Sequence, residues 1–214
     1  GRRRYWETLG RAYETGYATE SSQNVRLFSV STGPSFHFGD ALLSPRLNVA
    51  HVAKGHDDYL KTGGVSLAFE RALRRGVFAT ANVHCNWRSF EQDPERDAIN
   101  AGVGFSPVLT WGRNQNRLRG GLRFSREESD LDWKSYWRAA GLLGYQRNLP
   151  ADVTAFGRYR AEYTAYDETP AWATDEHNDL LHEVQLGVRK RIVKRVTGEI
   201  SYTYTDVNSG VSAY

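Results

Sequence analysis

Apolar and polar residues alternate along most of this chain, and each alternating stretch is long. The clearest example runs from residue 77 to residue 90, where one set of alternate positions is mainly apolar (Val77, Ala79, Ala81, Val83, Cys85, Trp87) and the other is polar (Thr80, Asn82, His84, Asn86, Arg88). Side chains of a β-strand point to opposite faces with a period of two residues. The stretch therefore predicts a strand with one apolar face and one polar face.

The same pattern recurs in six further stretches, at residues 99–109, 118–124, 133–146, 153–163, 180–191 and 196–204. Residues 4–18 and 25–38 alternate less cleanly. The polar faces of the strands carry charge, and the charged residues that we expect on the inner face are Arg88, Arg119, Arg123, Arg138, Arg158, Arg160, Glu162, Glu183, Arg189 and Glu199. The chain therefore predicts a sheet of long strands with arginine and glutamate on one face.

Two classes of fold turn the apolar face of such strands in opposite directions. A soluble sandwich or lipocalin-like barrel turns the apolar face inward, whereas a transmembrane barrel turns it towards lipid. Strands of about ten residues match a tilted membrane crossing, whereas the strands of soluble proteins cluster near five or six residues. The apolar faces are also rich in small residues and end in aromatic residues, which we expect at the two lipid interfaces: Trp87, Trp111, Trp133, Tyr145, Tyr163 and Tyr204. The predicted fold class is an all-β, antiparallel, up-and-down transmembrane β-barrel.

Connection lengths alternate between short and long. The predicted short connections lie at 38–41, 73–76, 112–116, 148–152 and 192–195, and the long ones at 19–24, 53–58, 91–97, 126–130, 167–178 and after 206. Outer-membrane barrels place short turns in the periplasm, which predicts a periplasmic N-terminus in a bacterial outer membrane.

This division gives eleven strands. Bacterial barrels have an even number of strands, because an open edge in lipid leaves backbone groups unpaired. We therefore expect residues 1–214 to form a single outer-membrane barrel domain that lacks its final, twelfth strand, supplied beyond Tyr214 or by another chain.

Composition narrows the remaining classes of protein. The mean hydropathy is −0.61, and no apolar run has the eighteen or more residues that a membrane helix requires. The net charge is only +3, and alternation spreads the basic residues around a wall, so no nucleic-acid surface is predicted. Cys85 is the single cysteine, which excludes an intramolecular disulfide.

Pro107 interrupts a predicted strand, and we expect a bulge or a strand end near it.

Candidate catalytic groups are few. A serine nucleophile needs a histidine within hydrogen-bond reach and a third group that orients the histidine. His84 and Ser106 share the polar face of neighbouring strands, whereas His182 and Ser201 lie on opposite faces. Residues of the predicted outer loops lack the spacing of metal ligands (His51, His56, Asp57, Asp58). We therefore expect no catalytic residue, metal or cofactor.

The ends of the chain resemble a known class of barrel. Residues 200–214 (ISYTYTDVNSGVSAY) are similar to the penultimate strand and outer loop of Gram-negative outer-membrane barrels. Residues 4–10 (RYWETLG) and 17–24 (YATESSQN) resemble the first hairpin of barrels that follow a periplasmic tetratricopeptide-repeat region. Surface lipoprotein assembly modulators and exopolysaccharide-export porins belong to that class. The chain differs from it in having neither helical repeats nor a C-terminal Phe.

The predicted function is an outer-membrane pore or translocation barrel that passes or exports a solute or polymer through a charged lumen. Rows of arginine in an open lumen favour anions, whereas a cross-strand network of ion pairs would fill a narrow one. The partners implied are outer-membrane lipid and a periplasmic or surface protein. A structural anchor with a filled lumen is one alternative function, and a lipid-modifying outer-membrane enzyme is the other.

Overall fold

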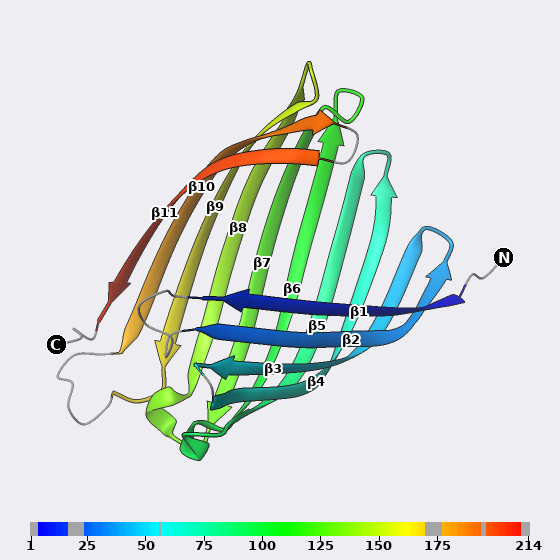
Figure 1. The fold of residues 1–214 in the computed structure, drawn as a ribbon. Helices are drawn as coiled ribbons and strands as arrows, with labels where there is room; N and C mark the ends of the chain where they lie inside the picture. The colour runs from blue at the N-terminus through cyan, green and yellow to red at the C-terminus, as the bar shows by residue number, and fades with distance from the viewer. Residues whose placement is uncertain (1–3, 17–23, 56, 170–176, 194–195, 211–214) are drawn as a thin grey trace.

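The computed structural model describes residues 4–16, 24–55, 57–169, 177–193 and 196–210. These residues form one antiparallel sheet of eleven strands in which each strand lies beside its neighbours in sequence (Figure 1). The strands are β1 (Arg4–Thr15), β2 (Val25–Phe38), β3 (Ala41–Lys54), β4 (Asp57–Arg74), β5 (Val77–Phe90), β6 (Ala98–Trp111), β7 (Asn116–Ser129), β8 (Tyr136–Leu149), β9 (Val153–Tyr166), β10 (Asn178–Val193) and β11 (Val196–Ser209).

Two short 3-10 helices, η2 (Pro94–Arg96) and η3 (Asp132–Lys134), lie in the connections β5–β6 and β7–β8. In the part of the chain that the structure describes, no helix has the length and apolarity needed to cross a membrane.

The all-β, antiparallel, up-and-down arrangement is confirmed. The sheet is strongly curved, so that β1–β4 lie in front of β5–β9 in Figure 1. We refer to the end with connections 39–40, 75–76, 112–115 and 150–152 as the short-turn end, and to the end that carries η2 and η3 as the long-loop end. Among the described residues, β1 and β11 are the two ends of the strand order, and each pairs on one side only. The twelfth strand stays a prediction.

The burial of side chains is inverted relative to a water-soluble domain. Among the described residues, the buried apolar ones are only Phe90, Ala98 and Tyr136. Buried polar residues are more numerous: Ser35, Ser44, Asn100, Ser125, Glu127, Ser135 and Thr164. Large apolar side chains on the opposite face are exposed instead, as Leu47 (61%), Ile99 (55%) and Leu186 (57%) show. Soluble proteins bury such residues, so this sheet has its polar face inside.

Two of the predicted connections are wrong. The β3–β4 connection lies between Lys54 and Asp57. Asp57 and Asp58 already belong to β4, where they pair with Lys54 and Ala53 of β3. The β7–β8 connection lies at 130–135 instead of 126–130, because β7 continues to Ser129. Charged residues suggested loops at both places, yet they are accommodated at the ends of strands.

Of the two features expected near Pro107, the bulge is absent, and β6 ends at Trp111, four residues further on. The register between β6 and β7 is the same on both sides of Pro107, with Phe105 opposite Leu122 and Val108 opposite Arg119. Gly120 has no side chain and therefore leaves room for the ring of Pro107. A Cβ atom on Gly120 would lie 3.3 Å from the Pro107 Cγ atom.

Two further prolines interrupt the pairing between β2 and β3. Residues 33–35 and 44–46 do not pair across this junction, and Pro34 and Pro45 offer no N–H donor. The Arg46 side chain compensates: its Nη1 atom donates to the carbonyl oxygens of Pro34 (2.7 Å) and Pro45 (3.0 Å). Its Nη2 atom donates to Ser35 Oγ (2.8 Å) and to the Glu7 carboxylate (2.6 Å). One side chain therefore satisfies carbonyl groups that the missing ladder bonds leave free.

Ala151 provides a test of the turn geometry. It adopts a left-handed conformation with φ of 59° in the β8–β9 turn, which costs a residue with a Cβ atom about 1 kcal/mol. We expect Ala151→Gly to raise the free energy of unfolding by about 1 kcal/mol, measured by urea titration of the folded protein. Ala155→Gly in β9 is the matched control, and we expect it to lower stability. A destabilised Ala151→Gly variant would contradict this turn.

Candidate functional site

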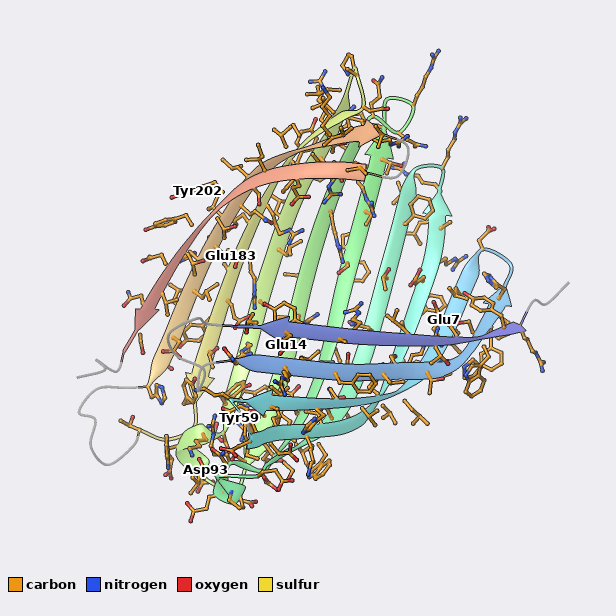
Figure 2. All side chains as sticks on the ribbon, viewed as in Figure 1. Glu7, Glu14, Tyr59, Asp93, Glu183 and Tyr202 are labelled. Atoms are coloured by element: carbon orange, nitrogen blue, oxygen red, sulfur yellow. The ribbon has the colours of Figure 1, made fainter. Side chains whose placement is uncertain are left out.

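The polar face encloses a cavity of about 690 Å³, which we call the inner cavity. Its lining comes from seven consecutive strands, from Glu70 on β4 to Glu183 on β10. One cavity can touch seven neighbouring strands only from the concave side of their sheet, so the polar face is the concave one. In Figure 2, Glu183 lies on this inner side, whereas Tyr202 projects away from the sheet.

The structure brings together the residues predicted for the inner face. Eight of the ten line the inner cavity: Arg88, Arg119, Arg123, Arg138, Arg158, Arg160, Glu162 and Glu183. The other two, Arg189 and Glu199, lie opposite each other on the same face nearer the short-turn end. The Nε and Nη2 atoms of Arg189 donate to one Glu199 carboxylate oxygen over 2.8 and 2.6 Å.

Some of the charges in the inner cavity are neutralised by contacts between neighbouring strands and along one strand. Glu162 has a side chain only 12% exposed; it forms an ion pair with Arg138, whose Nε atom lies 3.2 Å away, and accepts a hydrogen bond from Arg160. This carboxylate therefore holds two guanidinium groups on the wall of the cavity.

A second polar network lies nearer the long-loop end. Glu127 pairs with Arg88 and accepts from Asn100 Nδ2 over 3.2 Å. The Asn100 side-chain oxygen is in turn 3.0 Å from His84 Nε2.

Three arginines of the inner cavity remain without such contacts. Within the described residues, Arg119, Arg123 and Arg158 make no ion pair or side-chain hydrogen bond with the protein. Arg119 and Arg158 flank Gly144 in one row across β7, β8 and β9, and this glycine leaves the space between them open. The lining as a whole contains six arginines and three glutamates, a difference of +3. The inner cavity is therefore electropositive and attracts anions.

The candidate serine–histidine pair is not assembled. His84 lies opposite Gly102, whereas Ser106 lies four residues further along β6. At about 3.3 Å per residue, that separation exceeds the reach of a hydrogen bond several times over. The imidazole instead bonds to Asn100. In the part of the chain that is described, no group of three or more His, Cys, Asp or Glu residues is arranged to hold a metal ion.

Five of the six predicted interface aromatics face outward and are exposed: Trp87 (51%), Trp111 (43%), Tyr145 (40%), Tyr163 (46%) and Tyr204 (54%). Trp111 and Tyr145 stack at the short-turn end with ring centroids 6.1 Å apart. Trp87 and Tyr163 lie near the long-loop ends of β5 and β9. Tyr204 lies opposite Val184, nearer the middle of β11 than either end.

The prediction for Trp133 is wrong. Trp133 belongs to η3, where Lys134 N–H donates to the Leu131 carbonyl oxygen over 2.9 Å and ends the alternation. The Trp133 side chain lines a hollow on the inner side with Tyr136 and Tyr166. Its outward place is taken by Trp137, which is 60% exposed.

Sequence reasoning also missed Trp6, which faces outward on β1 and is 66% exposed. Its place beside Pro34 on the neighbouring strand identifies its face.

The long-loop end contains several buried residues, including Ser135 (2% exposed), Thr164 (4%) and Tyr136 (7%). Arg126 donates two hydrogen bonds to the Asp167 carboxylate in the β9–β10 loop and holds the pKa of that carboxyl below its usual range. Lys134 of η3 contacts Asp93 beside η2 over 3.2 Å. These contacts tie the loops to the wall at this end.

No family model and no curated protein matches this chain. Its function is therefore inferred from the geometry and charge of its own residues.

The ion-pair network gives a stability prediction. Glu162→Gln removes the carboxylate that two arginines share, so we expect the free energy of unfolding to fall by about 2 kcal/mol. Glu183→Gln is the matched control, because Glu183 lines the same cavity and makes no such contact with any residue that the structure describes. We expect the control to change stability by about 0.5 kcal/mol or less, measured by urea titration. Equal losses in the two variants would contradict the assigned network.

Proposed function

We propose that this protein is a pore or translocation barrel of a bacterial outer membrane, with a charged lumen formed by the inner cavity. One observation carries the proposal: polar side chains line the concave face, and large apolar side chains cover the convex face and are exposed. In water, so large an apolar surface would drive association. In lipid, the same surface is covered by acyl chains, and the hydrogen-bonded strands leave few backbone groups unpaired.

The proposal includes an orientation and a closing strand. The short-turn end would lie in the periplasm, as would the start of β1, because Arg4 pairs with Phe36 next to the β2–β3 turn. A twelfth strand between β1 and β11 would satisfy the free backbone groups of both edges. Either a further segment of the protein or another chain would supply that strand.

The transported species is proposed from the charge of the lumen. Arg119, Arg123 and Arg158 have no carboxylate partner among the described residues, so their charge acts on passing solutes instead of on the wall. An anionic solute or an acidic polymer therefore fits this lumen better than a cation. Passage would be passive, with the inward arginine and glutamate side chains selecting which charges enter.

A structural anchor is the second candidate. The packed residues at the long-loop end, among them Tyr136, Thr164 and Glu127, narrow the inner side there and favour an occluded lumen. Such a barrel would hold a periplasmic or surface protein partner without conducting. The third alternative, a lipid-modifying enzyme, has no comparable observation in its favour.

Single-channel conductance in a planar bilayer tests the pore. We expect steady conductance with anion preference, and we expect Arg119→Gln, Arg123→Gln and Arg158→Gln together to lower the anion-to-cation permeability ratio several-fold. The reason is that these variants remove the unpaired positive charges of the lumen. Arg147→Gln is the control, since Arg147 lies on the outward face.

The outcomes separate the candidates. A silent barrel whose fold is confirmed by circular dichroism would contradict the pore and favour the anchor. Failure of the protein to enter bilayers at all would contradict the membrane location.

A further inference from the structure

Most cations at the short-turn end lack an ion pair and most at the long-loop end have one; the exceptions are Arg189, which pairs with Glu199, and Lys54, which makes no ion pair within the described residues. Towards the long-loop end, six cations lie within ion-pair distance of a carboxylate: Arg26, Lys61, Arg88, Arg96, Arg126 and Lys134. At the short-turn end, six others make no ion pair within the described residues: Arg71, Arg74, Arg75, Arg113, Arg147 and Lys190. The positive charge of the short-turn end is therefore available to a partner outside the protein.

Three of these arginines converge on one hollow of about 1040 Å³, which we call the rim hollow. Arg74 and Arg75 come from the β4–β5 turn, and Arg113 comes from the β6–β7 turn. The two turns are held together because Thr110 N–H donates to the Gly76 carbonyl oxygen over 2.7 Å. Asp40 is the one acidic residue among those that line the rim hollow.

The rim hollow also has an apolar side that adjoins the exposed convex face. Leu73 (58% exposed) and Trp111 (43% exposed) line this side, whereas Phe78, which also lines the rim hollow, shares the concave face with Thr80. Trp111 stacks on Tyr145 of the outward face. The site is therefore amphipathic, with guanidinium groups beside an apolar surface.

The other three of those six cations at the short-turn end lie at the same height along the strands as the rim hollow. Arg71 is opposite Ala41 and Ala79, at the short-turn ends of their strands. Arg147 is opposite Asn116 and Ala155, and Lys190 is opposite Val153 and Gly198. These outward positions border the exposed apolar band, which is where the headgroups of a surrounding lipid leaflet would lie.

We propose that the rim hollow binds the phosphate of an anionic glycerophospholipid of the phosphatidylglycerol class, in the leaflet at the short-turn end. The proposal rests on the membrane location given under Proposed function. Guanidinium groups bind phosphate oxygens through paired N–H donors. The apolar side of the rim hollow receives the adjoining acyl chain, which distinguishes a lipid from a soluble acidic ligand. Each cation near a membrane surface strengthens binding of anionic lipid about five-fold.

The test measures lipid preference in vesicles of phosphatidylcholine that contain phosphatidylglycerol. Brominated forms of either lipid quench tryptophan fluorescence, and Trp111, which lines the site, reports on it in a background where the other five tryptophans are replaced by Phe. We expect the protein to favour phosphatidylglycerol about five-fold or more. We expect the triple variant Arg74→Gln, Arg75→Gln and Arg113→Gln to show a preference near one.

The matched control is the triple variant Arg119→Gln, Arg123→Gln and Arg158→Gln, which removes the same charge from the inner cavity. We expect it to keep the preference of the parent protein. Folding of each variant is checked by circular dichroism, and Arg75→Gln and Arg113→Gln are measured singly if the triple variant does not fold.

Each result has one meaning. A parent protein that inserts without preferring phosphatidylglycerol overturns the lipid site and leaves the proposed function intact. A rim variant that keeps the preference, or a control that loses it equally, also overturns the site. Failure of the parent to insert into pure phosphatidylcholine contradicts the proposed membrane location itself.

Discussion

Backbone pairing is the constraint on which the rest of this structure depends. Strands β2 to β10 are each paired on both sides, so the N–H and C=O groups of a long, curved wall are satisfied by neighbouring strands. Where two prolines interrupt that pairing, Arg46 donates to the exposed carbonyl oxygens instead. A wall satisfied in this way can present apolar side chains to one medium and polar side chains to another.

The alternation of side chains then sorts charge into separate environments. Inside, Glu162 and Glu127 neutralise some arginines, while Arg119 and Arg158 remain free beside Gly144. Outside, the apolar band carries almost no charge until the strand ends. Among the described residues, most cations at the short-turn end have no ion pair, and paired cations and carboxylates gather at the long-loop end. The proposed lumen and the proposed lipid contact both follow from this sorting.

Much of the fold could be predicted from the sequence, because a period of two residues identifies each strand and its faces together. The ten inner charges share one face for that reason. The period failed at Trp133, which has the same parity as Trp137 but lies within a 3-10 helix that no alternation reveals. It also failed at Asp57 and Asp58, whose charge suggested a loop where β4 begins.

Other features depend on register, which the sequence does not contain. The contact of Glu162 with Arg138 and the separation of His84 from Ser106 follow from the pairing of particular residues across strands. The rim hollow is assembled from two turns that are separated by a complete hairpin, so no local pattern marks it.

The central claim is that the apolar face meets lipid and the polar face meets water. Neighbouring residues of β5 test it directly, because Cys85 faces outward and Asn86 lines the inner cavity. The measurement is labelling of protein in vesicles with a water-soluble maleimide, on the parent and on Asn86→Cys in a Cys85→Ala background. The account predicts a protected thiol at position 85 and a reactive thiol at position 86. Rapid labelling at 85 with protection at 86 would contradict it.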